Sequence, residues 1–192
     1  DVTDLEMAST PTVEIAVTGL RAGGGIIITA SHNPANWNAL KLLNEKGEFL
    51  SAADGNEILK IASSEDFIFA LYDKLGSVVT DNSWGEKHID QVTKLNLVDI
   101  KTIKSASLTV AVDCINSVGG IILPLLLKKL GVKRVILLNS VPDGNFAHNP
   151  EPLPENLVEI SGIVPKEKAD VGFVVDPAVD RLAIICEDGS MF

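Results

Sequence analysis

Short apolar runs separated by turn residues dominate the first third of the chain. Three isoleucines at 26–28 follow three consecutive glycines, which predicts a short buried strand entered through a flexible loop. Residues 39–43 repeat the apolar pattern and predict a second strand. Residues 51–61 predict a helix, because Ser51 has the side chain of an N-cap and Asp54 places a carboxylate in the first turn.

Strands and helices alternate regularly in the second half of the chain. The apolar periods predict strands at 108–112, 134–138, 171–175 and 183–185, and helices at 119–130 and 155–160. Between the halves, residues 63–83 show no clean period, and residues 86–95 predict a polar linker helix. Such alternation is typical of βαβ units. We therefore expect the α/β class, with two units at residues 1–83 and 84–192 that each hold a mixed, largely parallel sheet between helices.

The composition excludes several classes of protein. Apolar residues make up 46% of the 192 residues, enough for a real core in one or two domains. The formal net charge of -10 disfavours a nucleic-acid binder, which presents a basic surface. The longest apolar run, at 121–127, is interrupted by Pro124 and is far shorter than the ~20 residues of a membrane helix. We expect a soluble protein that contacts neither nucleic acid nor membrane.

The two cysteines, Cys114 and Cys186, follow separate strand patterns and lack CxxC spacing. Buried free thiols are favoured over a disulfide, and free thiols are typical of a reducing cytoplasm. No charged and apolar leader follows Asp1, so we expect no secretion signal. The expected location is the cytoplasm.

Residues 29–34, which read TASHNP, place a hydroxyl, an imidazole and a proline turn directly after the first apolar run. Ser31 is then expected at the carboxyl end of a strand, the edge at which open α/β sheets bind ligands. Pro34 disfavours helical backbone at the residue before it, so the serine is expected on an accessible turn. Chemistry at Ser31 and His32 is one interpretation, and an ordinary loop is the other.

A second polar corner follows the strand predicted at 171–175. Residues 176–181 read DPAVDR and contain the carboxylates of Asp176 and Asp180 and the guanidinium of Arg181. Mg²⁺ prefers oxygen ligands and completes its shell with phosphate and water, so this corner suits a hard cation. Acidic turns are also common on protein surfaces, and a turn without a ligand is the alternative.

Taken together, these segments resemble the α-D-phosphohexomutases, the phosphoglucomutase and phosphomannomutase family. The resemblance rests on the serine loop at 29–34 with WNALK at 37–41, and on residues 176–181, which are similar to the family's DxDxDR metal loop. Supporting matches are STP at 9–11, Asp113 with Asn116 and Gly119, and FAHNPEP at 146–152. The order and spacing of these motifs agree across nearly the whole chain.

Members of this family carry a phosphate on an active serine, pass it to a hexose phosphate and recover the other phosphate of the resulting bisphosphate. The resemblance implies that Ser31 is the phosphoserine and that its phosphate is a Mg²⁺ ligand together with Asp176 and Asp180. A phosphoserine carries a charge of roughly -1.5 to -2, which the metal neutralises while the reacting oxygens are held in line. Arg181 is expected to bind the phosphoryl group through a forked contact.

Two further residues match family positions beside the phosphoserine. The resemblance implies Lys41 as the general acid or base and His32 as a supporting contact. Each has a plainer alternative, because a His32 that hydrogen-bonds its own turn and a Lys41 exposed at a strand end need no catalytic role. His148, in the proline-rich loop at 139–154, is expected to be structural.

The chain departs from the family in three respects, the smallest of which is Ala39 in place of a usual glycine. Ala178 stands where the family has the middle aspartate of the metal loop, so Mg²⁺ binding is expected to be weakened or absent. The family has four domains, of which the third recognises the sugar and the fourth carries a phosphate-binding loop. The motifs present here belong to domains one and two. They imply part of an enzyme that interconverts the 1-phosphate and 6-phosphate of a hexose, glucose or mannose, with little or no turnover by this part alone.

Two other functions remain open at this point. A phosphatase would let water remove a phosphate from Ser31, but no second metal cluster or water-activating base is visible near that residue. A noncatalytic binding or scaffold module is favoured by Ala178 and by the lack of sugar-recognition motifs. The sequence leaves the sugar and the oligomeric state open.

Overall fold

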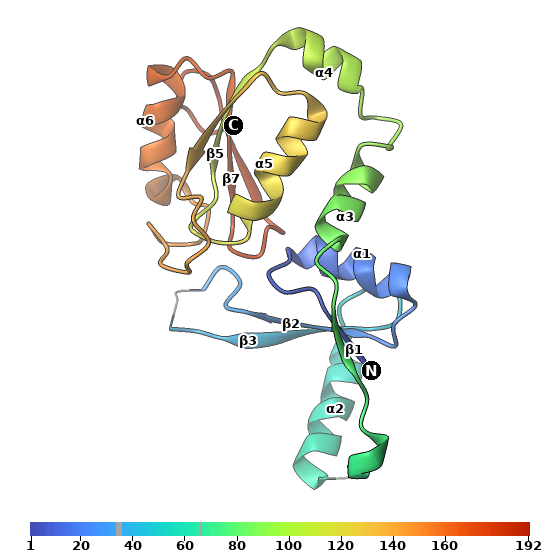
Figure 1. The fold of residues 1–192 in the computed structure, drawn as a ribbon. Helices are drawn as coiled ribbons and strands as arrows, with labels where there is room; N and C mark the ends of the chain where they lie inside the picture. The colour runs from blue at the N-terminus through green and yellow to red at the C-terminus, as the bar shows by residue number, and fades with distance from the viewer. Residues whose placement is uncertain (34–35, 66) are drawn as a thin grey trace.

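Helices and strands alternate along the chain in the computed structural model, which describes residues 1–33, 36–65 and 67–192. The helices are α1 (Thr10–Leu20), α2 (Ala52–Ser64), α3 (Trp84–Val92), α4 (Ile100–Ala106), α5 (Gly119–Leu130) and α6 (Val158–Lys166), with 3-10 turns η1 (Tyr72–Lys74) and η2 (Pro154–Asn156). The strands are β1 (Val2–Asp4), β2 (Gly25–Thr29), β3 (Ala39–Leu43), β4 (Val78–Thr80), β5 (Thr109–Asp113), β6 (Arg134–Leu138), β7 (Val171–Val175) and β8 (Leu182–Ile185). Figure 1 shows the β2 and β3 pair below the body that contains β5 and β7.

The second unit, residues 84–192, is built on a sheet with the strand order β6-β5-β7-β8. β5 pairs in parallel with β6 and β7, and β8 pairs antiparallel with β7. Helices α5 and α6 lie on opposite faces of this sheet (Figure 1). Leu127 of α5 clusters with Val110, and Ile160 of α6 clusters with Val174. This mixed, largely parallel sheet between helices confirms the predicted α/β class.

The first unit, residues 1–83, holds two strand pairs, a parallel pair of β1 with β4 and an antiparallel pair of β2 with β3. Helix α1 packs on the β2 and β3 pair, where Val17 clusters with Ile27. The prediction of a buried isoleucine strand was wrong for two of the three residues, since Ile26 and Ile28 are 66% and 72% exposed. Successive side chains of a strand point to opposite faces, and α1 covers the face of Ile27.

Capping side chains mark the starts of three helices. Ser51 caps α2 in a complete capping box with Asp54, which confirms the predicted helix start. Helix α1 was not predicted from the apolar pattern, although the Ser9 side chain caps it and Pro11 lies in its first turn. Helix α4, also unpredicted, follows Asp99, whose side chain accepts a backbone N–H of the first turn. In both cases the cap was a usable sequence signal.

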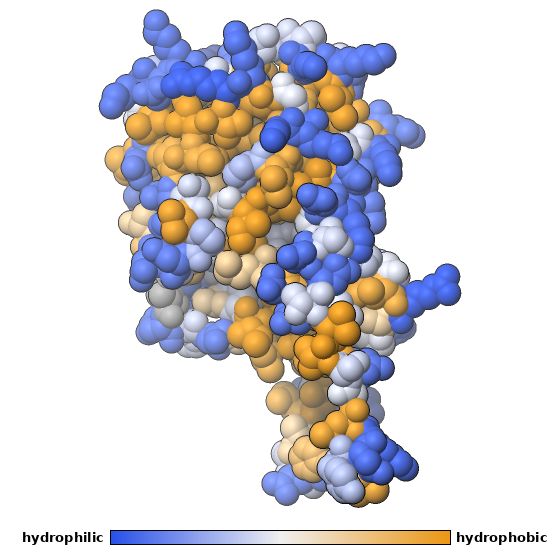
Figure 2. Space-filling model, viewed as in Figure 1, coloured by the Kyte–Doolittle hydropathy of each residue, from blue (hydrophilic) through white to orange (hydrophobic). Residues whose placement is uncertain are grey.

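Helix α2 projects from the body of the molecule (Figure 1) and has no buried residue. Its apolar side chains Ile58, Leu59 and Ile61 are exposed. Figure 2 shows apolar residues on this projection and on the narrow part of the molecule next to it. Contiguous apolar surface of this kind is typical of surfaces that contact other protein.

Both cysteines are free thiols. Cys114 is fully buried, and burial together with the neighbouring Asp113 raises the pKa of its thiol to about 12. Cys186 is only half-buried, so the prediction of buried thiols holds for one cysteine of the two. Within the described ranges, no helix has the length and apolar character needed to cross a membrane.

Candidate active site

Ser31 lies on a tight turn directly after β2. Its φ of +53° is in the left-handed region, which costs a residue with a side chain about 1 kcal/mol or more. The Ser31 N–H donates to Thr29 Oγ1 at 2.9 Å. The Asn33 N–H donates to the Ala30 carbonyl at 3.1 Å, which closes the turn. Pro34 of the same motif lies outside the described residues. The serine hydroxyl is therefore held half-buried on a strained turn at the end of a strand.

The imidazole of His32 lies beside the serine hydroxyl. Its Nδ1 is 3.3 Å from Ser31 Oγ. Its Nε2 is 3.6 Å from Oε2 of Glu151, which belongs to the proline-rich loop at 139–154. The imidazole thus joins the serine turn of the first unit to a loop of the second unit. A His32 that bonds only its own turn does not account for the contact with Glu151.

The acidic corner at 176–181 begins where β7 ends. Oδ1 of the fully buried Asp176 accepts the N–H groups of Asp180 at 3.0 Å and Arg181 at 3.1 Å. Oδ2 of Asp176 is also buried and has no hydrogen-bond partner in the described part of the chain. Burial, and then the charge of Asp180, raise the pKa of Asp176. Val179 has a φ of +58°, a strained value for a β-branched residue.

Both units hold the acidic corner by its backbone carbonyls. The N–H of Thr10, at the start of α1, donates to the Ala178 carbonyl at 3.0 Å. The hydroxyl of Ser117, after β5, donates to the Pro177 carbonyl at 2.8 Å. The corner is therefore clamped between the first helix of the chain and the sheet that carries it.

Lys41 of β3 reaches the acidic corner directly. Its Nζ lies 2.6 Å from Oδ2 of Asp180, and the two side chains are 20% and 26% exposed. The same pair acts on Glu14 of α1. Burial and then the charge of Asp180 raise the pKa of Glu14, and the charge of Lys41 lowers it. Lys41 is therefore an ion-paired residue and not a solvated one. Glu14 was missed by the sequence reasoning, since α1 was not predicted.

Arg181 forms an ion pair that the sequence reasoning also missed. Its NH1 donates to Oε1 of Glu151 at 2.6 Å. Glu151 was visible only as part of the FAHNPEP motif, and no role followed from its position there. Two oxygens of one carboxylate thus contact Arg181 and His32.

The predicted site residues belong to one continuous chain of contacts across the two units. Ser31 contacts His32, His32 contacts Glu151, and Glu151 contacts Arg181. Arg181 follows Asp180 in the sequence, and Asp180 contacts Lys41. A cavity of about 1100 Å³ borders this site and is lined by β1, β2, Ala30 and Ala178. The arrangement places a serine hydroxyl, two cationic side chains and two carboxylates where a phosphoryl group with a counter-ion would have matching partners.

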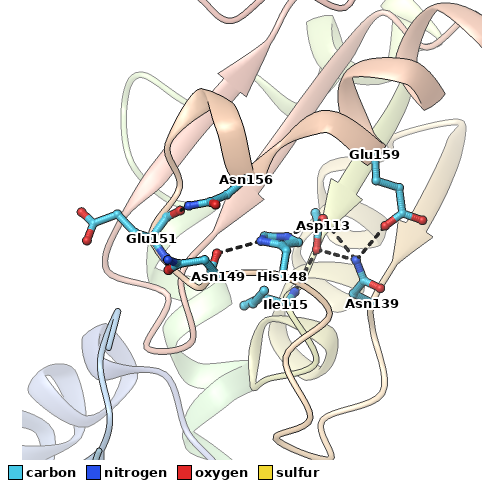
Figure 3. A network of polar contacts seen from close by, with 8 residues as sticks. All are labelled: Asp113, Ile115, Asn139, His148, Asn149, Glu151, Asn156 and Glu159. Carbon is cyan, nitrogen blue, oxygen red and sulfur yellow. Dashed lines mark hydrogen bonds and ion pairs between the residues drawn. The ribbon is translucent and has the colours of Figure 1, made fainter. Parts of the chain in front are cut away.

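A buried polar network ties the loop at 139–154 to the sheet (Figure 3). Asp113, the last residue of β5, is 1% exposed, and its Oδ2 lies 3.1 Å from Nε2 of His148. Both Asp113 oxygens accept from Asn139 Nδ2 at 3.2 Å, and Oδ1 also accepts the Ile115 N–H at 3.0 Å. The hydrogen bond to Asp113 raises the pKa of His148. These contacts agree with the structural role expected of His148.

The pKa values of two histidines are shifted in opposite directions, so we expect the two residues to make the free energy of unfolding depend on pH in opposite ways. The pKa of His148 is raised, so its contribution is complete below pH 6.5 and is lost as the pH rises through the folded-state pKa. Burial lowers the pKa of His88, whose Nδ1 lies 2.9 Å from Thr12 Oγ1, so stability is lost as the pH falls below 6.5. We expect the urea midpoint to pass through a maximum between about pH 5 and about pH 8, and to decrease on either side of it.

Each histidine provides the control for the other. His148→Gln is expected to flatten the alkaline side of this profile and to leave the acidic side, whereas His88→Gln is expected to do the reverse. A profile that keeps both slopes in both variants would contradict the assignment of the pH dependence to these side chains.

The chain matches two consecutive models of one protein family. Residues 1–69 match "Phosphoglucomutase/phosphomannomutase, alpha/beta/alpha domain I", and residues 86–189 match domain II of the same family. The chain belongs to the phosphoglucomutase/phosphomannomutase family. This membership confirms the resemblance that rested on the serine loop and the acidic corner.

Curated members of the phosphoglucomutase/phosphomannomutase family are similar over nearly the whole chain. The phosphoglucomutase/phosphomannomutase of Thermococcus kodakarensis is 38% identical over 98% of this chain and 41% of its own length. A probable phosphoglucosamine mutase of Methanobrevibacter smithii is 36% identical over 100% of this chain and 42% of its own length. The chain therefore spans about two fifths of the length of these relatives.

Solved structures of the phosphoglucomutase/phosphomannomutase family share the fold. The putative phosphomannomutase from Thermus thermophilus has a TM-score of 0.81 at 25% identity, over 96% of this chain and 41% of that protein. A family protein from Burkholderia thailandensis has the same TM-score at 27% identity, over 100% of this chain and 41% of that protein. The fold of both units is therefore that of family members.

Proposed function

We propose that this chain carries the phosphoserine and the cation loop of a phosphohexomutase, which interconverts hexose 1-phosphates and hexose 6-phosphates. The observation that carries the proposal is the ion pair between Lys41 and Asp180 at 2.6 Å, because it brings the strand after the Ser31 loop against the acidic corner. Family membership supports this class of reaction. The relatives are named for glucose, mannose and glucosamine phosphates, so the proposal extends to the hexose phosphate class and to no single sugar.

The acidic corner fits a Mg²⁺ ion with a small set of ligands. Oδ2 of Asp176 is a buried carboxylate oxygen without a partner in the described residues, which is the kind of atom that a cation satisfies. Asp180 supplies a second carboxylate, and we propose a phosphate oxygen on Ser31 as a further ligand. When bound, Mg²⁺ neutralises charge on the phosphoryl oxygens. Ala178 supplies no oxygen ligand from its side chain, so we propose that Mg²⁺ binding at this corner is weak.

Each side chain has a separate task in the proposed reaction. Ser31 Oγ forms a bond to phosphorus while the bond from phosphorus to the sugar oxygen breaks. The hydroxyl proton of Ser31 moves to Nδ1 of His32, 3.3 Å away. Lys41 acts as the general acid that gives a proton to the departing sugar oxygen, and as the base in the reverse direction. Arg181 binds the phosphoryl oxygens through its fork of N–H donors.

A noncatalytic binding module is the second candidate function. Ala178 favours it, because the buried methyl group occupies the position of a family carboxylate. Such a module would keep the fold and the ion pair between Lys41 and Asp180 without carrying a phosphate.

Intact-mass spectrometry separates the two candidates. For a phosphohexomutase we expect one stable phosphoryl group, located on Ser31, and binding of Mg²⁺ in a calorimetric titration. An unmodified chain that binds no Mg²⁺ would favour the module.

We also expect little or no mutase turnover from the 192 residues alone, because the matched family models are those of domains I and II and the sugar is recognised by a third. Turnover at a rate typical of enzymes would contradict that part of the proposal.

A further inference from the structure

Glu151 contacts two residues of the proposed site with one carboxylate. Oε1 accepts from NH1 of Arg181 at 2.6 Å, and Oε2 lies 3.6 Å from Nε2 of His32. On its other side, the His32 ring presents Nδ1 to Ser31 Oγ at 3.3 Å. Ser31, His32 and Glu151 therefore form a line from a hydroxyl through an imidazole to a carboxylate.

The backbone of Glu151 is held on both sides (Figure 3). Its N–H donates to Asn149 Oδ1 at 3.2 Å, and its carbonyl accepts from Asn156 Nδ2 at 2.8 Å. The same loop is anchored to the sheet where His148 contacts the buried Asp113. In Figure 3 the Glu151 side chain points away from this network. The second unit thus supplies a carboxylate to the serine turn from a fixed position.

A carboxylate beside one ring nitrogen selects the tautomer of a histidine. A neutral imidazole carries its proton on one nitrogen, and the hydrogen-bond partners decide which nitrogen this is. At 3.6 Å the contact is longer than a hydrogen bond, but the negative charge of Glu151 still favours an N–H on Nε2, which leaves Nδ1 of His32 bare. A bare Nδ1 is an acceptor for the Ser31 hydroxyl. Nucleophile, base and orienting acid are combined in this way in many hydrolases.

The ion pairs of Glu151 contribute little to stability. The side chains of Glu151, His32 and Arg181 are 32%, 31% and 42% exposed. Water screens pairs with this exposure, so each adds little to the stability of the fold. A carboxylate in this position therefore matters through the geometry that it imposes on its two partners.

We propose that Glu151 is a positioning residue for the phosphoserine reaction. It holds His32 with the proton on Nε2, so that Nδ1 accepts the hydrogen bond of the Ser31 hydroxyl, and it holds the guanidinium of Arg181 next to the same turn. This inference rests on the proposed function of Ser31. It adds to that function a residue from the second unit that organises the serine turn of the first.

Nitrogen-15 NMR of the 192-residue chain measures the tautomer directly, because protonated and bare ring nitrogens have well-separated chemical shifts. In the neutral form of His32 we expect the proton on Nε2. In Glu151→Gln we expect a mixture of both tautomers, because an amide can donate as well as accept. Glu151→Asp, which keeps the charge on a shorter side chain, is expected to retain part of the preference. Glu155→Gln removes an equal charge from an exposed residue of the same loop region and is the control.

The rate of phosphate uptake provides the second readout. Dephosphorylated Ser31, in a protein that also contains the sugar-binding part of the family, is incubated with a hexose 1,6-bisphosphate, and the phosphorylated fraction is followed by intact mass. We expect uptake to be slower by about tenfold or more in Glu151→Gln, and unchanged in Glu155→Gln. The thermal midpoint should stay near that of the parent chain in both variants.

The two readouts distinguish the inference from the proposed function. If Glu151→Gln keeps both the tautomer and the uptake rate of the parent chain, the positioning role is wrong and the function of Ser31 stands. If Ser31 never takes up phosphate in the protein that contains the sugar-binding part, the proposed function fails. The role of Glu151 then fails with it, even where the tautomer depends on Glu151. A changed tautomer together with slower uptake supports both.

Discussion

Ser31→Ala is expected to abolish phosphate incorporation completely. Phosphate transfer through the enzyme needs an oxygen that forms a bond to phosphorus, and alanine has none. Intact-mass spectrometry of chains purified from the same cells should show one phosphoryl group on the parent chain and none on the variant. In a protein that also contains the sugar-binding part of the family, mutase turnover should fall to the uncatalysed rate.

The fold of this variant should be intact, which makes the result interpretable. Serine and alanine both carry a Cβ, so the left-handed backbone at position 31 costs each of them about the same. Ser63→Ala is the matched control, because the Ser63 hydroxyl donates only within α2, to the carbonyls of Leu59 and Lys60. Phosphate that persists in Ser31→Ala and disappears in another serine variant would place the carrier elsewhere.

Ala178→Asp is expected to strengthen Mg²⁺ binding by about tenfold or more. A third carboxylate adds ligand charge at the corner where Asp176 has an unpartnered oxygen, and ligand charge count is a main determinant of affinity for hard cations. Calorimetric titration with Mg²⁺ measures the change. Without metal, the variant should be less stable than the parent chain, because position 178 is 4% exposed and a buried carboxylate repels Asp176 and Asp180.

A rise in thermal midpoint on adding Mg²⁺ should therefore be larger in Ala178→Asp than in the parent chain. Asn56→Asp is the control, since it adds the same charge on the exposed surface of α2. Equal Mg²⁺ affinity in Ala178→Asp and the parent chain would mean that the ion, if bound, does not sit at the acidic corner. Higher affinity in Asn56→Asp as well would point to a general effect of net charge.

The second unit could be predicted closely because its strands are continuous apolar runs between polar ends. The predicted bounds at 134–138 and 171–175 coincide with β6 and β7, and those at 119–130 coincide with α5. Helix α6 begins three residues later than expected, because the predicted start falls in the 3-10 turn η2. A 3-10 turn and the first turn of an α-helix have similar residue preferences, so the pattern does not separate them.

The first unit was harder to predict for a physical reason. Two buried positions of α1 are occupied by Thr10 and Thr12, so the apolar period of that helix is broken. The hydroxyl of Thr12 contacts Nδ1 of His88, and the backbone N–H of Thr10 donates to the Ala178 carbonyl in the acidic corner. The side chain of Thr12 and the backbone of Thr10 therefore make contacts with the second unit that no local pattern reveals. Strands β1 and β4 have three residues each, which is too short for a period.

The candidate site was predictable where its residues are neighbours in sequence. Ser31 and His32 are adjacent, and Asp176 and Arg181 share one short loop. Glu151 has no such neighbour, because its partners come from other segments and meet it only in the folded chain. Which carboxylate of a loop turns toward the serine depends on the path of the backbone, and the sequence shows no sign of it.

The clamp on the acidic corner also constrains how the molecule can move. The hydrogen bond from Thr10 to Ala178, the ion pair of Lys41 with Asp180 and the contact of His32 with Glu151 all cross between the units. A hinge motion of one unit as a rigid body would stretch all three together. Opening such a hinge and dismantling the site would thus be a single event.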